Sequence, residues 1–97
     1  MADLGIVPFT FNNAGNMASL GILGGQTGDR EDLLIGSEAH TAAFDTYTVV
    51  RLIPEADCVI RIGEDAIAEV ATGDPLTAGI EAMRYVKEGE RISVIAA

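Results

Sequence analysis

The run YTVVRLIPEADCVIRI, residues 47–62, contains the pattern that decides the fold. Its first part, Tyr47–Ile53, is rich in β-branched residues and ends at Pro54, which has no amide proton to continue a hydrogen-bonded ladder. In its second part, Cys58–Ile62, every other residue is apolar and Arg61 points the other way. Two short runs of this kind, separated by a turn, predict two β-strands.

Further runs toward the C-terminus extend the same pattern. AMRYVK (82–87) and RISVI (91–95) both alternate, and KEGE (87–90) places a glycine to turn a hairpin between them. AIAEVA (66–71) is open to two interpretations, because its alanines fit a strand or a helical turn. We therefore predict a mainly β fold, a small antiparallel β-sandwich or barrel, in a compact domain over residues 46–97.

Alternation also predicts which side chains form the core of this domain. Cys58 lies on an apolar face, so we expect a buried, inert thiol. The other expected core residues are Val50, Leu52, Ile60, Ile62, Val86, Ile92 and Val94.

The N-terminal part of the chain differs in composition. Seven of the eleven glycines lie in the first 36 residues, which predicts an extended, Gly-rich N-terminal arm and loop region over residues 1–45. A short helical turn is expected at Asp32–Ile35. Residues 1–28 cannot bury enough surface alone to offset the entropy of ordering, so we expect them to become ordered on a partner.

The apolar part of this arm is VPFTF (7–11). In an extended chain it places three apolar side chains on one side, while Pro8 argues against a central strand. The predicted partner-binding residues are Val7, Pro8, Phe9, Thr10 and Phe11.

Composition excludes several classes of partner. The net charge is −9 and the six basic residues are scattered, whereas nucleic-acid binding needs clustered Lys or Arg, so we expect no nucleic acid. No apolar run approaches the ~20 residues of a membrane span, so we expect no membrane partner. The hydrophobic content of 48% is high for one small domain, which favours burial against a partner or a homo-oligomer.

Catalytic and cofactor motifs are incomplete. GIEAMRYVKEG (79–89) is similar to the modification hairpin of biotin-carrier domains, but Arg84 stands where the modified lysine would be. We interpret Arg84 as a solvent-facing strand residue. His40 is the single histidine and Cys58 the single cysteine, too few for the ligand spacings of a zinc site, so His40 is expected in a surface loop. We expect no catalytic residues, no cofactor and no metal, and hence no enzyme.

The β region resembles a known class of protein. VVRLIPEADCVIRIG (49–63), PLTAG (75–79) and YVKEGERISVI (85–95) together resemble small virion structural proteins of tailed bacteriophages over about residues 47–96. The resemblance implies a capsid decoration (cement) protein that binds the assembled head and stabilises capsomer junctions. The alternative is a tail or head-fibre module that binds a receptor or glycan. It ranks lower, because stacking on a sugar calls for exposed aromatic side chains and the compact region offers only Tyr47 and Tyr85, with no tryptophan in the chain.

The decoration interpretation carries further expectations. The major capsid protein would be the partner, and the chain would be made in the host cytoplasm and reside on the capsid surface of the virion. A homotrimer is favoured because one trimer can bridge three capsomers, and a dimer is the main rival because twofold assemblies are common.

Overall fold

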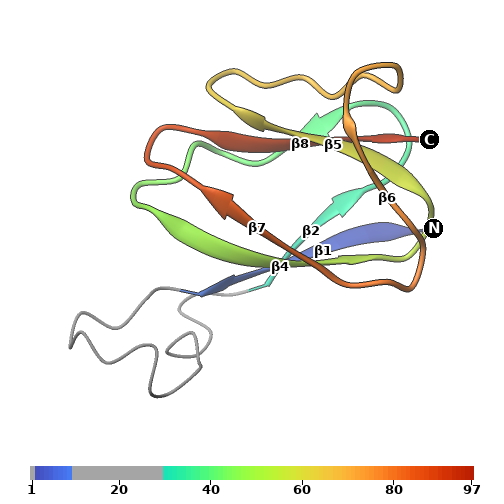
Figure 1. The fold of residues 1–97 in the computed structure, drawn as a ribbon, viewed down its shortest axis with the longest axis horizontal. Coiled ribbons are helices and arrows are strands. Elements are labelled where there is room, and N and C mark those ends of the chain that lie inside the picture. Colours follow the sequence, from blue (N-terminus) through green and yellow to red (C-terminus); the bar gives the residue numbers. More distant parts are fainter. Residues whose placement is uncertain (1, 10–29) are drawn as a thin grey trace.

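Two four-stranded antiparallel sheets form the described part of the chain (Figure 1). The computed structural model describes residues 2–9 and 30–97. Sheet A has the strand order β2 (Glu31–Leu34), β1 (Asp3–Phe9), β4 (Thr48–Pro54), β7 (Ala82–Val86). Sheet B has the order β3 (Ala39–His40), β8 (Arg91–Ala96), β5 (Cys58–Gly63), β6 (Asp74–Leu76). The predicted mainly β fold is confirmed, and the sandwich is the form it takes.

The strands pair in nested fashion. β5 pairs with β6 in sheet B, β4 with β7 in sheet A, and β3 with β8 in sheet B. Successive pairs therefore alternate between the sheets, which is the wrapping of a jelly roll. In a jelly roll, the next strand outward, β2, would pair with a strand that follows β8 in the chain. Here β2 pairs instead with β1, which precedes it in the chain.

The core lies between the two sheets and contains the predicted residues. Alternation along the strands predicts the core residues correctly because each strand has one face against the opposite sheet. Of the predicted core residues, Ile62 is only partly buried, and the fully enclosed ones are Val50, Leu52, Ile60, Val86, Ile92 and Val94. Cys58 is also fully buried, and this burial raises the pKa of its thiol, with neighbouring Asp57 adding to the effect.

The N-terminal prediction needs the largest correction. Asp3–Phe9 forms an internal strand of sheet A, paired with β2 on one side and β4 on the other, so these residues are not an arm. Pro8 is tolerated because β2 pairs β1 only as far as Ile6. Beyond that residue β1 has a described neighbour, β4, on one side alone. Residues 10–28 of the predicted arm lie outside the described residues.

Four local predictions are also corrected. Residues 87–90 do form a turn, with Gly89 at a φ of 87°, but the turn joins sheet A to sheet B and makes no hairpin. The segment Asp32–Ile35 falls largely in β2 and is not helical. AIAEVA (66–71) is neither strand nor helix, and His40 lies in the short strand β3.

The segment 64–73, here called the strap, connects β5 to β6 and folds over the outer face of sheet B (Figure 1). Ala66 and Ala68 of the strap are buried, and so are Val59 and Ser93 on the sheet. A Cβ at Gly73 would collide with the side chain of Val59, so glycine is needed for this close approach. The strap thus closes one outer face of the sandwich.

Candidate interaction surface

Within residues 2–9 and 30–97, no connecting segment crosses the outer face of sheet A as the strap crosses that of sheet B (Figure 1). Because Val50 and Leu52 point into the core, the residues between and beside them point outward. We define the sheet-A face as the outward residues of β1, β4 and β7: Val7, Phe9, Val49, Arg51, Ile53, Met83 and Tyr85.

Strand register orders these side chains in rows across the sheet. Val49 lies between Phe9 and Tyr85 in one row. Arg51 lies between Val7 and Met83 in the next. Val7 and Val49 are nearly inaccessible, whereas Met83 is 45% exposed and Tyr85 62% exposed. The face therefore has a filled aliphatic floor and an accessible rim.

A pair of tyrosines stands at one end of this face. The ring of Tyr47, just before β4, lies beside that of Tyr85 on β7, with the centroids 5.7 Å apart and the planes tilted by 31°. Both rings are substantially exposed, although large apolar surfaces are usually buried in small domains. Together they form an aromatic platform that continues the rim.

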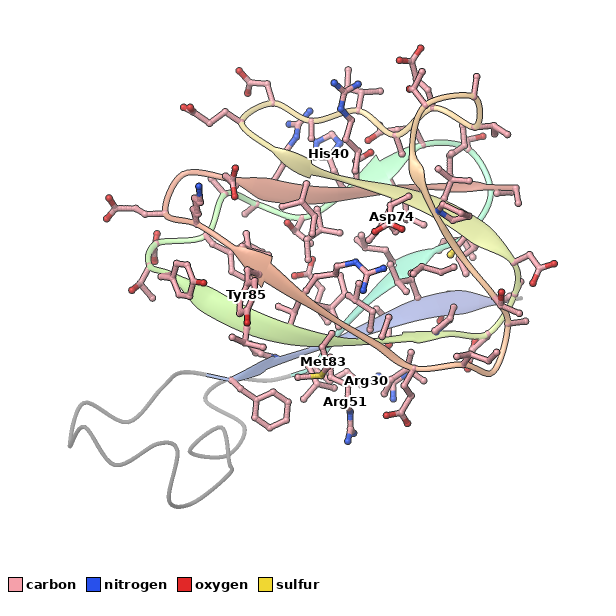
Figure 2. All side chains as sticks on the ribbon, viewed as in Figure 1. Arg30, His40, Arg51, Asp74, Met83 and Tyr85 are labelled. Atoms are coloured by element: carbon pink, nitrogen blue, oxygen red, sulfur yellow. The ribbon has the colours of Figure 1, made fainter. Side chains whose placement is uncertain are left out.

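Arg30 and Arg51 place two guanidinium groups on the same side of the sandwich as the sheet-A face (Figure 2). Arg30 lies over the backbone of Gly5, where a Cβ would collide with it, and its Nε donates a hydrogen bond to Oδ1 of Asp32 over 2.8 Å. Arg51 lies near Glu81, with 3.5 Å from its Nε to Oε1 of the carboxylate. Each cation has an acidic neighbour, so the face is close to neutral in a chain of net charge −9.

On the opposite side, Ser93 ties the strap to the sheet. The backbone amide of Ala68 donates to Oγ of Ser93 over 2.8 Å, and that hydroxyl donates to Oε2 of Glu38 over 2.6 Å. Nδ1 of His40 lies 2.9 Å from the same carboxylate oxygen. Both hydrogen bonds lower the pKa of the Glu38 carboxyl, and that of Ser93 has the larger effect.

This arrangement does not match a serine hydrolase. There, histidine stands between the hydroxyl and the carboxylate and takes the proton from serine. Here the Glu38 carboxylate stands between Ser93 and His40, and Ser93 is completely buried. The three residues are therefore arranged to hold the strap.

The described sheet edges are protected against pairing with another chain. β3 is two residues long, and β6 is three residues long and contains Pro75. β2 carries Glu31 and Asp32, and on β7 the Arg84 side chain donates to the Met83 carbonyl oxygen over 2.8 Å. Short strands, proline and charge are common protections of this kind, so contact through a face is favoured over strand addition.

The predicted partner-binding residues are only partly brought together. Val7 and Phe9 lie on the sheet-A face, as their shared alternation requires, but Val7 is only 4% exposed. Pro8 pairs with the inward-facing Val50 and so points to the other side of the sheet. Thr10 and Phe11 lie outside the described residues. Their partner-binding role stays a prediction.

The sequence prediction missed the other members of the face. Arg51, Met83 and Tyr85 each alternate with an inward residue, and that signal was visible in the sequence. Their proximity depends on β7 pairing with β4, which alternation alone does not encode.

Outside this face, the described residues offer little to a small ligand. Two surface hollows on the strap side are open and lined largely by polar and charged groups, including Arg61, Glu64 and Arg91. In residues 2–9 and 30–97, no group of three or more His, Cys, Asp or Glu side chains is placed to hold a metal ion. A membrane-spanning helix is likewise not found there.

Comparison with known proteins identifies no relative: no family model, no curated protein and no solved structure matches the chain.

Proposed function

We propose that the chain is a capsid decoration protein of a tailed bacteriophage, and that it docks on the assembled head through the sheet-A face. The sheet-A face, with its exposed Met83 and Tyr85 rim, is the observation that supports docking. The resemblance of residues 47–96 to small virion proteins supports the choice of the capsid as partner.

The composition of the face suits a protein–protein interface. Tyrosine, methionine and arginine are enriched in such interfaces, where a few of them provide most of the binding energy. The strap covers Val59 and Ser93 on the other outer face, and the described edges are protected, so we place the contact on the sheet-A face, although Ile67 and Val70 of the strap are also exposed.

Homotrimerisation belongs to the same proposal. A trimer would bring three sheet-A faces to a point where three capsomers meet, and weak individual contacts would add up. The net charge of −9 would keep unassembled copies apart in solution.

Deleting residues 1–28, the direct test of an N-terminal arm, would also remove internal strand β1 and unfold sheet A, so side-chain substitutions are needed.

The test is co-sedimentation with purified, expanded heads that lack decoration. Met83→Glu and Tyr85→Glu each add a charge to the face, and should abolish binding and the gain in heat resistance of the heads. Ile67→Glu is the matched control because Ile67 is 54% exposed on the strap, on the other side of the molecule. If the parent protein leaves the heads unbound, the decoration proposal is wrong.

The tyrosine pair favours a second candidate, a tail or fibre module that binds a glycan. Aromatic side chains present the flat apolar faces on which sugar rings can pack, and Tyr47 and Tyr85 form an exposed platform. Immunogold labelling of the parent virion separates the two candidates. A regular array over the head supports decoration, and label confined to the tail supports the glycan module.

A further inference from the structure

We infer that Arg51 is the anchor of the sheet-A face and that its guanidinium binds a carboxylate presented by an apolar patch of the docking partner. This inference rests on the proposed docking role of the face and specifies the chemistry of the partner.

Arg51 lies in the middle of the face. It is on β4, between Val7 of β1 and Met83 of β7, and Val49 and Ile53 flank it along its own strand. Figure 2 shows Arg51 and Met83 together on the side of the sandwich away from His40. Val7 and Val49 are already buried, so a partner would cover the exposed Met83 and the partly buried Ile53. Water would then be excluded, and the charge of Arg51 would interact more strongly with an opposite charge.

The guanidinium of Arg51 has unused hydrogen-bonding capacity. Its Nε is buried without a hydrogen-bond partner, and the Glu81 oxygen 3.5 Å away is farther than in an ordinary N–H···O hydrogen bond. The side chain as a whole is 43% exposed, so its terminal amino groups reach the surface. In contrast, Arg30, Arg84 and Arg91 each donate hydrogen bonds to described residues.

The surroundings of Arg51 select a single negative charge. A planar guanidinium offers two parallel N–H groups that match one carboxylate. Glu81 and the Arg30–Asp32 pair already balance much of the local charge, and the net charge of −9 disfavours a phosphate dianion. The accessible apolar surface of Met83 and Ile53 adds affinity for a carboxylate attached to an apolar group.

Arg61 provides a matched comparison. It also lacks a hydrogen bond among the described residues, and it lies 3.8 Å from a Glu69 oxygen. It is on the outer face of sheet B, in a hollow that it shares with three acidic residues of the strap, Glu64, Asp65 and Glu69, and with Ala66 and Ile67. If charge alone were sufficient, Arg61 and Arg51 would bind carboxylates equally.

The experiment uses NMR of the full-length chain, labelled with ¹⁵N and with ¹³C in its methionine methyl groups. Phenylacetate is the probe, benzyl alcohol is the control that lacks the carboxylate, and inorganic phosphate tests the other anion. We expect saturable shifts of the Arg51 Nε–H and Met83 methyl signals with phenylacetate and none at Arg61. Arg51→Gln should bind about tenfold more weakly at Met83, the loss expected for a charge-assisted pair.

Four results would overturn the inference: no saturable shift, equal shifts at Arg61, a stronger response to phosphate, or shifts on diluting the protein alone. The last would mean that a second copy occupies the face. Binding of Arg51→Gln to undecorated heads is measured separately. If the variant binds the heads like the parent protein, Arg51 is not the anchor and the decoration proposal stands. If the parent protein itself does not bind, the decoration proposal is wrong, and the phenylacetate titration alone decides about Arg51.

Discussion

Ser93 connects three segments that are far apart in the sequence. Its hydroxyl accepts from the Ala68 amide on the strap and donates to Glu38 before β3, while its backbone lies in β8. Buried polar groups cost free energy unless they are hydrogen-bonded, and here one hydroxyl satisfies a buried amide and a carboxylate together. The hold of the strap on sheet B therefore depends strongly on one oxygen atom.

Ser93→Ala is predicted to lower the free energy of unfolding by about 1–3 kcal/mol, because it leaves the buried Ala68 amide without an acceptor. Urea denaturation measures the loss, and amide exchange at Ala68 should become faster. Ser37→Ala is the control, because Ser37 is exposed. Equal stability of the two variants would show that the hydroxyl does not hold the strap.

The lowered pKa of Glu38 predicts a dependence of stability on pH. A carboxylate whose pKa is lower in the folded state stabilises the fold above its unfolded pKa, and this contribution is lost as the pH falls through the folded value. Glu38→Gln should therefore be less stable than the parent near pH 7 and equal to it once the carboxylate is protonated. Urea titrations at a series of pH values test this, and a difference that persists in acid would contradict it.

The sequence predicted which residues of β8 point into the core, but it did not predict the burial of Ser93. Ile92 and Val94 were predictable as core because they alternate with Ser93. The same alternation suggests that Ser93 faces solvent, and it would do so without the strap. A loop that folds back over a sheet has no periodicity, so its contacts could not be predicted.

Among the strands, β6 and β7 are held together across the gap between the sheets. Arg84 pairs in register with the inward-facing Val50, so its side chain points toward sheet B. Its Nε lies 2.7 Å from Oδ2 of Asp74, and its Nη2 lies 3.3 Å from Oδ1. The hydrogen bonds to Asp74 raise the pKa of Arg84, and they correct its interpretation as a solvent-facing residue.

A double-mutant cycle with Arg84→Gln and Asp74→Asn should give a coupling of about 0.5–1 kcal/mol, limited by the partial exposure of both side chains. The matched cycle at Arg61 and Glu69 should give almost none, because that pair is 3.8 Å apart and more exposed. Thermal or urea unfolding of the two sets provides the comparison. Equal couplings would mean that the bidentate geometry adds nothing.

Strand existence was easier to predict than strand partnership. YTVVRLI and CVIRI appear in the sequence as two strands beside one turn, yet β4 and β5 belong to different sheets. The same holds for β7 and β8 around Gly89. Alternation specifies which side of a strand is buried, and it does not specify which strand lies beside it.

As a whole, the molecule has the nested pairing of a jelly roll with its outermost strand moved to the start of the chain. The Ala2 carbonyl accepts from Ile35, and the amide of Ala96 donates to Gly36, each over 3.0 Å. Both ends of the described chain therefore lie beside the same turn (Figure 1). Ends this close allow a chain to be rejoined and reopened elsewhere.

A circular permutant tests this topology. Joining residue 97 to residue 1 with a short Gly-Ser linker and opening the chain within residues 10–29 should preserve both sheets, because no described strand is cut. We expect cooperative urea unfolding with an unchanged m-value. A permutant opened between Val50 and Arg51, inside β4, should not fold. Loss of cooperativity in the first permutant would contradict the assigned strand order.

We have proposed that the molecule docks through the sheet-A face. Carbene footprinting of the parent protein, free and bound to undecorated heads, tests this docking site. We predict that labelling falls at Met83 and Tyr85 and stays unchanged at Ile67 and Val70 on the strap, all of which are exposed in the unbound chain. Protection of Ile67 and Val70, with Met83 and Tyr85 still labelled, would place the contact on the opposite side and contradict the claim.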